Sequence, residues 1–426
     1  MRCKYQGEGY SIEGGGMIFR ANRFADRRPR DLQALRSACI ATLSLLASAG
    51  AAQAASAPAA PAAAAGRPVA QLPVPPASGE MGFVFSAFVD AVYPGMQDAC
   101  PDGLANLVRD NFLSTVPPEE RARLLKPENE PELTQRWKAY GFSPDHRMNV
   151  CGNYDKFDHP LYKTVQSKIA YGVNLDGAVS GEHPHDPYVC PHQKFVSPDG
   201  EKGVDNQYYR AMGCERNHRG PDGKIGDILI GDKSALMSDY TIVMILRNVH
   251  SLVDDDNVEV LLASSQDKPI VDSQQNFIRN ASYHVTKNPK WRNVLHGRIV
   301  NGVLTTESSD IVLERQLGNK PRGVPTDWNF ARSRLRIVFK PDGTLDGVVG
   351  GYVPLIMNLL QAIGGSAGTV TVADMDCSSQ YRTIKALADG ERDPATGQCD
   401  RISSAMHIEA VPAFVFDHTT MQAEAK

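Results

Sequence analysis

The sequence lacks the short motifs that mark nucleotide-dependent and thiol-dependent chemistry. It has no Gly-x-Gly-x-x-Gly fingerprint and no Walker-type loop, so nucleotide use lacks its usual signature. It has no Cys-x-x-Cys pair, which removes the signature of thioredoxin-like redox chemistry and of covalent haem attachment. The 49 acidic residues offer too many pairs to nominate the two carboxylates of a glycosidase. We therefore assign no catalytic residue.

One serine matches a hydrolase motif by letter only. Residues 364–368 read Gly-Gly-Ser-Ala-Gly, but a nucleophile elbow needs a strand before the serine and a helix after it. Here a helix-like run over 355–363 precedes Ser366 and a strand-like run over 369–372 follows it. The order is reversed, and we predict a connector.

Long apolar runs and basic clusters are also missing from most of the chain. A membrane-spanning helix needs roughly 20 predominantly apolar residues, and we expect no transmembrane segment in the mature chain after residue 54. The formal charge is −4, and removing residues 1–54, which carry a net charge of +4, leaves −8. An acidic body without a basic cluster after Arg36 argues against a nucleic-acid partner.

The N-terminus has the layout of a secretory signal peptide. An apolar stretch over 38–50 is followed by Ala-Gln-Ala at 52–54, as a signal peptidase requires. The preceding basic region contains Arg20, Arg23, Arg27, Arg28, Arg30 and Arg36. We predict a signal peptide over 1–54, with Met17 as a second candidate start, cleavage near Ala54, and a periplasmic or extracellular location.

Six cysteines follow the predicted signal peptide, an even number that predicts disulfides in an oxidising compartment. Short loops are entropically the easiest to close. We therefore expect Cys190–Cys214 and Cys377–Cys399, which leaves Cys100–Cys151.

Composition divides the remaining chain into five segments. Residues 55–79 are almost entirely Ala, Pro, Ser, Gly and Val, which predicts a disordered tether. Residues 80–141 are expected to be helical, with a first helix around 83–92 and further helices around 121–126 and 131–140. Residues 142–232 are rich in Gly, Pro, Asp and His and predict an irregular segment pinned by a disulfide.

A β pattern dominates residues 233–353, and residues 354–426 predict C-terminal helices with a disulfide-closed tail. Asn301-Gly302 and Asp342-Gly343 are hairpin turn signals between apolar runs. The fold class expected is mainly β with flanking helices (α+β), built on an antiparallel β-sandwich of jelly-roll type. The strand-like runs are 240–246, 258–262, 291–300, 303–306, 311–317, 335–340 and 345–351.

A histidine-rich loop is the sharpest local anomaly. His183, His185 and His192 lie within ten residues, and imidazole is a common ligand for zinc or copper. Interleaved prolines and a disulfide at Cys190 favour a solvated loop over a metal site.

The following loop suggests calcium. Asp199, Asp205 and Asn206 supply the oxygen donors that Ca²⁺ requires, on a Gly-rich segment. The helix–loop–helix calcium spacing is not met, and Asx turns explain the same residues without an ion. We favour the turns.

Three functions are compatible with these observations. We favour an exported, non-enzymatic binding module for a ligand, glycan or protein partner. The alternatives are a metal-dependent extracytoplasmic hydrolase that uses the loops over 183–227, and a structural protein of the cell envelope.

Overall fold

A computed structural model describes residues 72–94, 96–104, 107–215, 241–315 and 326–418. The predicted signal peptide over 1–54 and most of the predicted tether over 55–79 lie outside these residues, as does the end of the segment predicted over 142–232. Among the described helices, none has the length and apolar character needed to cross a bilayer.

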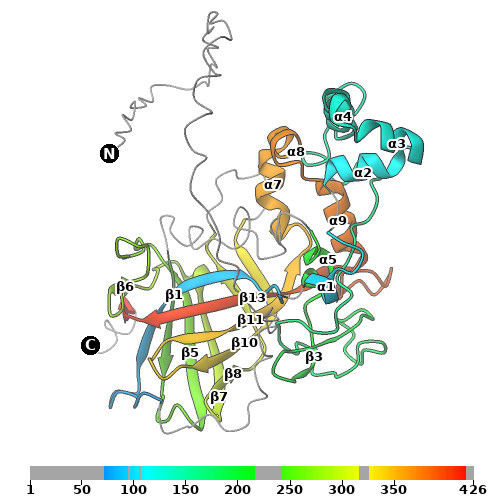
Figure 1. Ribbon diagram of the computed structural model, residues 1–426. Helices are drawn as coiled ribbons and strands as arrows, with labels where there is room; N and C mark the ends of the chain where they lie inside the picture. Colours follow the sequence, from blue (N-terminus) through cyan, green and yellow to red (C-terminus); the bar gives the residue numbers. More distant parts are fainter. Residues whose placement is uncertain (1–71, 95, 105–106, 216–240, 316–325, 419–426) are drawn as a thin grey trace, which may run out of the picture. The chain divides into compact units, whose positions relative to one another are not determined.

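Eight antiparallel strands form a closed barrel, because the first and last strands of the path also pair with each other. Their order around the barrel is β1, β4, β5, β7, β8, β10, β11 and β13 (Figure 1). The bounds are β1 Met81–Asp90, β4 Thr241–Arg247, β5 Asp255–Ser265, β7 Arg292–Val300, β8 Val303–Thr306, β10 Trp328–Phe339, β11 Leu345–Pro354 and β13 Cys399–Pro412. Closure leaves none of these eight with an unpaired edge.

Shorter strands extend this sheet or lie beside it. β9 (Ser309–Leu313) pairs with β10, and β12 (Gly390–Arg392) pairs with β13. β6 (Ser282–His284) and β14 (Phe414–Phe416) form a parallel pair, and η4 (Pro289–Trp291) precedes β7.

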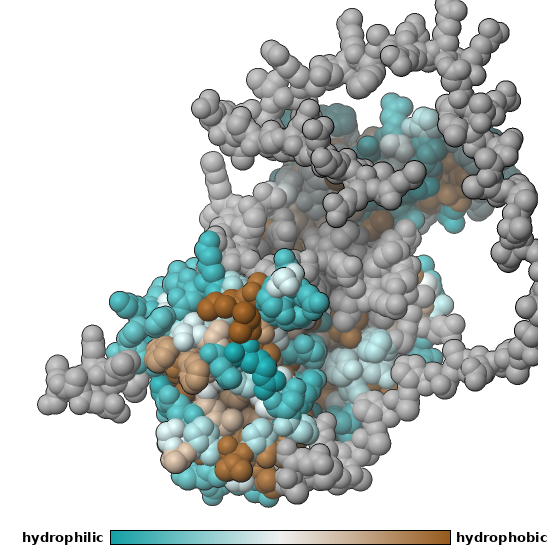
Figure 2. Space-filling view, turned by 60° about the vertical axis from the view of Figure 1, so that its left-hand side comes forward, coloured by the Kyte–Doolittle hydropathy of each residue, from teal (hydrophilic) through white to brown (hydrophobic). Residues whose placement is uncertain are grey.

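The barrel interior holds the largest hydrophobic core. Alternate residues of each strand point inward, so that Phe83 of β1, Leu345 of β11 and Ile408 of β13 join one cluster. The intervening residues face outward, where hydrophilic and smaller hydrophobic areas are mixed over the face visible in Figure 2.

The jelly-roll prediction is wrong. Each predicted strand between 240 and 351 overlaps an observed strand, but successive strands are neighbours in the barrel and do not cross between two sheets. Asn301 and Gly302 both have positive φ, as the predicted hairpin requires, whereas Gly343 alone does so in the second turn. The sandwich interpretation failed because β1 and β13 lie outside 233–353 and close the barrel.

The helix predicted around 83–92 is also wrong, since these residues lie mostly in β1. A β-bulge between Phe85 and Ala87 shifts by one residue which side chains of β1 point into the barrel. Phe83, Phe85 and Phe88 all pair with inward-facing residues of β13, although their spacing does not follow a strict period of two. The resulting spacing of the three phenylalanines resembles the spacing of apolar residues on one face of a helix.

The helices form a separate layer with its own core. Its helices are α2 Val108–Thr115, α3 Pro118–Leu124, η2 Pro127–Asn129, α4 Glu130–Tyr140, α7 Leu360–Gly365, α8 Ala367–Ala373 and α9 Cys377–Ala386. The short helix η5 (Met357–Leu359) precedes α7, and its Met357 and Leu359 join the cluster of the barrel. Leu133 and Trp137 of α4 pack in one cluster with Val370 of α8. The run 369–372, predicted as a strand, therefore belongs to α8, and Ser366 connects two helices.

A covering segment, residues 165–215, packs on the outer face of β11 and β13. It contains the short strands β2 (Phe195–Val196) and β3 (Lys202–Val204) and the helix α5 (Gln207–Met212), while α1 (Met96–Ala99) precedes it in the chain. The backbone N–H of Gln207 donates to the hydroxyl of Ser403 on β13, 2.9 Å away. A methyl group at Gly350 of β11 would lie 2.4 Å from Val173, so the two layers are in close contact.

The six cysteines among the described residues all form disulfides, but none of the three expected pairings is correct. The bonds are Cys100–Cys214, Cys151–Cys377 and Cys190–Cys399. Loop-closure entropy rises only slowly with loop length, so tertiary placement outweighs it. Cys190–Cys399 ties the covering segment to β13, and three disulfides are consistent with a protein that works outside the cytoplasm.

Candidate functional site

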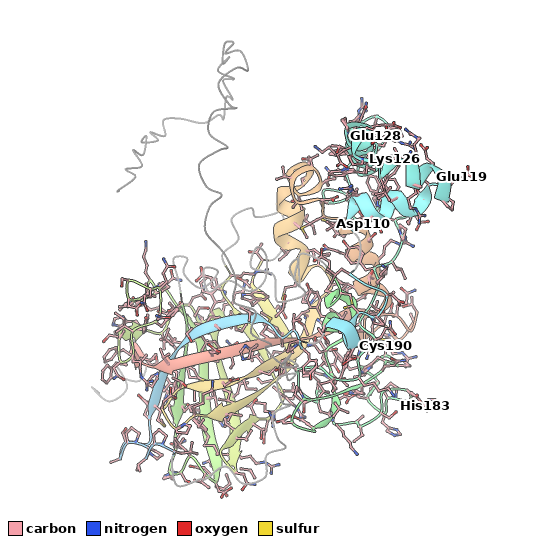
Figure 3. All side chains as sticks on the ribbon, in the orientation of Figure 1. Asp110, Glu119, Lys126, Glu128, His183 and Cys190 are labelled. Carbon is pink, nitrogen blue, oxygen red and sulfur yellow. A yellow bond between two sulfur atoms is a disulfide. The ribbon has the colours of Figure 1, made fainter. Side chains whose placement is uncertain are left out.

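The predicted histidine ligands do not converge. His183 and His185 are exposed, and Figure 3 shows His183 at the outer edge of its loop. His192 alone is buried, with its side chain 4% exposed. Among the described residues, no group with metal-ligand spacing contains His183 or His185.

The three predicted calcium ligands have separate partners. Asp199 forms an ion pair with Arg336 of β10. Asn206 accepts a hydrogen bond from the backbone N–H of Tyr209 at 3.0 Å and so caps helix α5. Asp205 instead faces His192. One residue of the predicted calcium site therefore lies beside one residue of the predicted histidine site.

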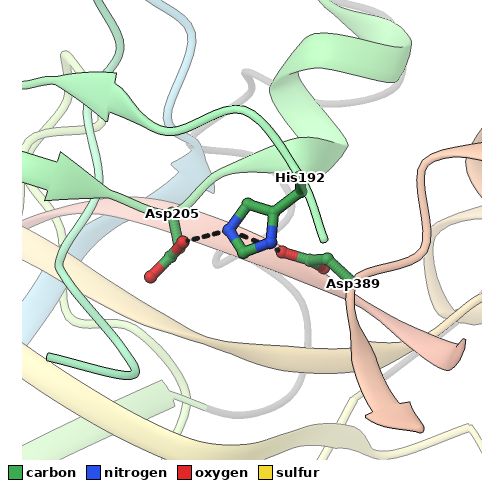
Figure 4. Close-up of side chains that lie close together, drawn as sticks. All are labelled: His192, Asp205 and Asp389. Carbon is green, nitrogen blue, oxygen red and sulfur yellow. Dashed lines mark hydrogen bonds and ion pairs between the residues drawn. The ribbon is translucent and has the colours of Figure 1, made fainter. Parts of the chain in front are cut away.

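His192, Asp205 and Asp389 form a buried cluster (Figure 4). The Nε2 atom of His192 lies 2.8 Å from Oδ1 of Asp205 and 3.7 Å from Oδ2 of Asp389. Asp205 lies between β3 and α5, and Asp389 lies between α9 and β12. The cluster therefore joins the covering segment to the wall of the barrel.

Backbone contacts hold each member of the cluster. The Nδ1 atom of His192 is 2.8 Å from the carbonyl oxygen of Cys190. Oδ2 of Asp205 accepts from the N–H of Leu175 at 2.8 Å, and Oδ1 of Asp389 accepts from the N–H of Ser403 at 2.6 Å.

One ammonium group and a third carboxylate complete the cluster. The Nζ of Lys194 lies 2.6 Å from Oδ1 of Asp205 and 2.7 Å from Oδ1 of Asp176. The side chains of Lys194 and Asp176 are at most 5% exposed. Three carboxylates against one ammonium leave an excess of two negative charges whenever His192 is neutral.

Burial and these charges shift two pKa values. Burial raises the pKa of Asp389 from 3.8 to about 6, although His192 acts in the opposite direction. Burial lowers the pKa of His192, but the hydrogen bond to Asp205 and the charge of Asp389 outweigh burial and raise it. The cluster therefore attracts positive charge.

A polar groove on the outer wall of the barrel is the second candidate site, with a volume of about 810 Å³. Its floor is formed by β7, β8 and β10, and the covering segment contributes Val173, Asn174 and Glu201. Other polar residues that line it are Asp256, Asn257, His296, Arg298, Thr305, Glu307, Arg334 and Arg336.

Strand register places the groove's charged residues in two rows. Arg298 of β7 pairs with Thr305 of β8, which pairs with Arg336 of β10. Arg334, two residues before Arg336, faces the same side of the sheet one row further along. Neighbouring strands lie about 4.8 Å apart, so Arg298 and Arg336, two strands apart, are separated by about 10 Å.

A smaller cleft of about 560 Å³ lies on the same outer wall. There Asp346 of β11 pairs with His407 of β13 at 3.2 Å and with Lys340 at 2.9 Å. The His407 hydrogen bond is the main cause that lowers the pKa of Asp346 to about 2. These ion pairs satisfy the charges of Asp346 and Lys340 within the cleft.

Sequence reasoning missed Asp389 and the groove. Asp389 is 184 positions after Asp205 in the numbering, and no local pattern distinguishes it from other turn aspartates. The groove residues come from four strands and from the covering segment, so only strand register brings them together.

Comparison with known proteins gives no relative from which to transfer a function: no family model, no curated protein and no solved structure matches this chain.

Proposed function

We propose that this protein is an exported, non-enzymatic binding module that holds an acidic oligosaccharide in the polar groove of its barrel. The observation that carries this proposal is the presence of arginine side chains in the groove without carboxylate partners. Within the described residues, Arg298 and Arg334 form no ion pair, whereas Arg336 is paired with Asp199.

Unpaired arginines suit an anionic ligand. A guanidinium group presents a planar fork that binds a carboxylate through two parallel hydrogen bonds. Arg298 and Arg334 both line the groove, so a ligand carboxylate there would meet a guanidinium group that forms no ion pair within the described residues.

The remaining lining suits a hydroxyl-rich ligand. Asn174, Asn257, Thr305 and Glu307 supply both donors and acceptors along the groove. A volume of about 810 Å³ lies within the usual range of ligand sites, roughly 300–1,000 Å³. A uronic-acid oligosaccharide combines the required carboxylates and hydroxyls.

The other two functions have less support. A metal-dependent hydrolase needs an accessible ligand position, and the side chains of His192, Asp205 and Asp389 are at most 4% exposed. A purely structural role gives no reason for two unpaired arginines in one groove.

Titration calorimetry with the full chain tests the proposal. Oligouronates are compared with neutral oligosaccharides of the same length, at low and at moderate salt. We expect binding of the acidic series alone, weakened by salt. The double variant Arg298→Ala/Arg334→Ala should lose about 10- to 100-fold in affinity, since a hydrogen bond to a charged group contributes about 1.5–3 kcal/mol.

A charge-matched control uses Arg147→Ala/Arg392→Ala, two exposed arginines outside the groove. This variant should bind like the unaltered protein. Equal binding of neutral and acidic sugars, no binding at all, or equal loss in both double variants would each refute the proposal.

Export is tested separately by the mass of the mature chain. Cleavage near Ala54 predicts a product that begins at about residue 55. An intact N-terminus on protein recovered from the periplasm or medium would contradict this part of the proposal.

A further inference from the structure

The His192 cluster needs additional positive charge that the described residues do not supply. The ammonium group of Lys194 contacts Asp176 and Asp205, while Asp389 contacts His192, in a nearly closed site. An uncompensated buried charge costs several kcal/mol, so either protons or a cation must balance it.

The hydrogen bonds of His192 fix which ring nitrogen is available. Nδ1 faces the carbonyl oxygen of Cys190, which only accepts, so Nδ1 carries a proton. Nε2 then points its lone pair at Oδ1 of Asp205, 2.8 Å away, while Oδ2 of Asp389 lies 3.7 Å from the same nitrogen. That arrangement is repulsive unless Nε2 binds a second proton or a metal ion.

Asp389 supplies an independent indication. Its side chain is fully buried, yet Oδ2 accepts no hydrogen bond within the described part of the chain. This oxygen lies 3.7 Å from Nε2 of His192, too far for a hydrogen bond, and in Figure 4 the line that joins the two atoms passes across the imidazole ring. A buried carboxylate oxygen without a donor is costly and normally has a partner.

We propose that Nε2 of His192, Oδ1 of Asp205 and Oδ2 of Asp389 bind a divalent transition-metal ion, with Zn²⁺ as the closest match. A divalent ion cancels the two excess negative charges with His192 neutral. One ring nitrogen of His192 and one oxygen from each carboxylate all lie within 4.8 Å of one another. Separations of 2.8 and 3.7 Å bracket the roughly 3.0–3.4 Å expected when bonds of about 2.1 Å meet at angles between octahedral and tetrahedral values.

The donor set selects the class of metal. One imidazole nitrogen and two carboxylate oxygens suit Zn²⁺ or Mn²⁺. Calcium prefers an all-oxygen site of six to eight ligands, so the nitrogen ligand disfavours it.

The surrounding contacts resemble the outer shell of a metal site. A ligating histidine usually donates its other N–H to a carbonyl or carboxylate, as Nδ1 of His192 does to Cys190. Lys194 and the N–H of Leu175 donate to the two oxygens of Asp205, which orients that carboxylate.

The consequence is a structural role, independent of the groove proposal. Asp205 and His192 belong to the covering segment, and Asp389 lies beside β12, which pairs with the barrel strand β13. A bound ion would therefore clamp the covering segment to the barrel. Because Asn174 and Glu201 of the same segment line the groove, the clamp would also hold one wall of that groove.

Metal analysis of the full chain, purified without chelators or affinity-tag metals, tests the inference. We expect a single equivalent of zinc per chain. Dialysis against a chelator should lower the melting temperature, and added ZnCl₂ should restore it. Cobalt substitution should give the visible absorption of a bound Co²⁺ ion.

Two variants separate metal binding from folding. In Asp389→Asn the side-chain oxygen still accepts a hydrogen bond from the backbone N–H of Ser403, but the negative charge of the ligand is lost. This variant should weaken zinc binding by at least about tenfold. His185→Ala removes an exposed histidine of the same loop and should bind zinc normally. Circular dichroism of each variant checks that it is folded.

Each other outcome overturns the inference. Zinc retained equally by both variants would show adventitious binding elsewhere. Absence of zinc together with a melting temperature that ZnCl₂ does not change would show that protons balance the cluster. In that case stability should instead increase on acidification, and Asp389→Asn should be neutral or stabilising at pH 7.5.

Discussion

Gly390 lies directly against the ring of Tyr352, and a methyl group at Gly390 would stand 2.3 Å from Cδ1 of that ring. Tyr352 is fully buried on the outer face of β11, and Gly390 immediately follows Asp389 of the cluster. Because Gly390 has no Cβ atom, β12 and Asp389 can approach the barrel this closely.

Replacement of this glycine should destabilise the protein. Gly390→Ala should lower the free energy of unfolding by about 1–3 kcal/mol, because a buried overlap forces the neighbouring groups to move. Gly368→Ala is the matched control, since that exposed helical position has no neighbour within 4 Å and alanine favours a helix. Chemical denaturation measures both, and equal effects would contradict the packing argument.

Asp90 should make stability depend on pH. It pairs with the inward-facing Met406, and burial raises its pKa from 3.8 to about 7 despite the opposing charge of Arg315. The folded state then retains a proton that the unfolded state releases above pH 3.8. Its contribution to stability is therefore full below pH 3.8 and is lost as the pH rises to about 7.

Asp90→Asn removes this dependence. The variant should gain about 1–4 kcal/mol relative to the unaltered protein between pH 4 and pH 8, the upper figure corresponding to the full shift. Asp400→Asn, at an exposed position of β13, should show no such trend. A variant-minus-parent difference that stays flat across this range would disprove the assignment.

Arg210 should be a stabilising residue of the covering segment. Its guanidinium lies 4.1 Å from the centre of the Phe195 ring and donates to the carbonyl of Val165 at 3.2 Å and to Gln207 at 3.1 Å. Arg210→Ala leaves these buried acceptors without a donor and should cost about 2–4 kcal/mol.

Arg147→Ala provides the comparison for Arg210, since that side chain is 87% exposed. Its effect should stay within about 0.5 kcal/mol. Thermal denaturation of the two variants under one set of conditions measures the contrast, and similar losses would show that the contacts of Arg210 add little.

Peptide mapping should recover the long-range disulfides. Digestion without reduction should give linked peptides for Cys100–Cys214, Cys151–Cys377 and Cys190–Cys399. Replacement of both Cys190 and Cys399 by alanine should cost about 2–5 kcal/mol. Detection of Cys190 linked to Cys214 in native protein would contradict the structure.

Local sequence patterns determined the parts of this fold that depend on near neighbours. The strand-like runs between 240 and 351 overlap the observed strands, and Asn301-Gly302 adopts the positive φ values of the predicted hairpin. The helices expected around 121–126 and 131–140 also overlap α3 and α4. Alternating side chains, turn residues and helix starts act over a few residues, so the sequence shows them directly.

The closure of the barrel, the pairing of the cysteines and the assembly of the His192 cluster were decided by the tertiary structure alone. The bulge in β1 hid its strand pattern, and β13 lies more than 300 residues after its partner β1. The disulfides follow the spatial order of the chain, because the entropy of closing a loop depends only weakly on its length. His192 and Asp205 could be nominated from composition, but Asp389 joins them only because β12 packs beside the covering segment.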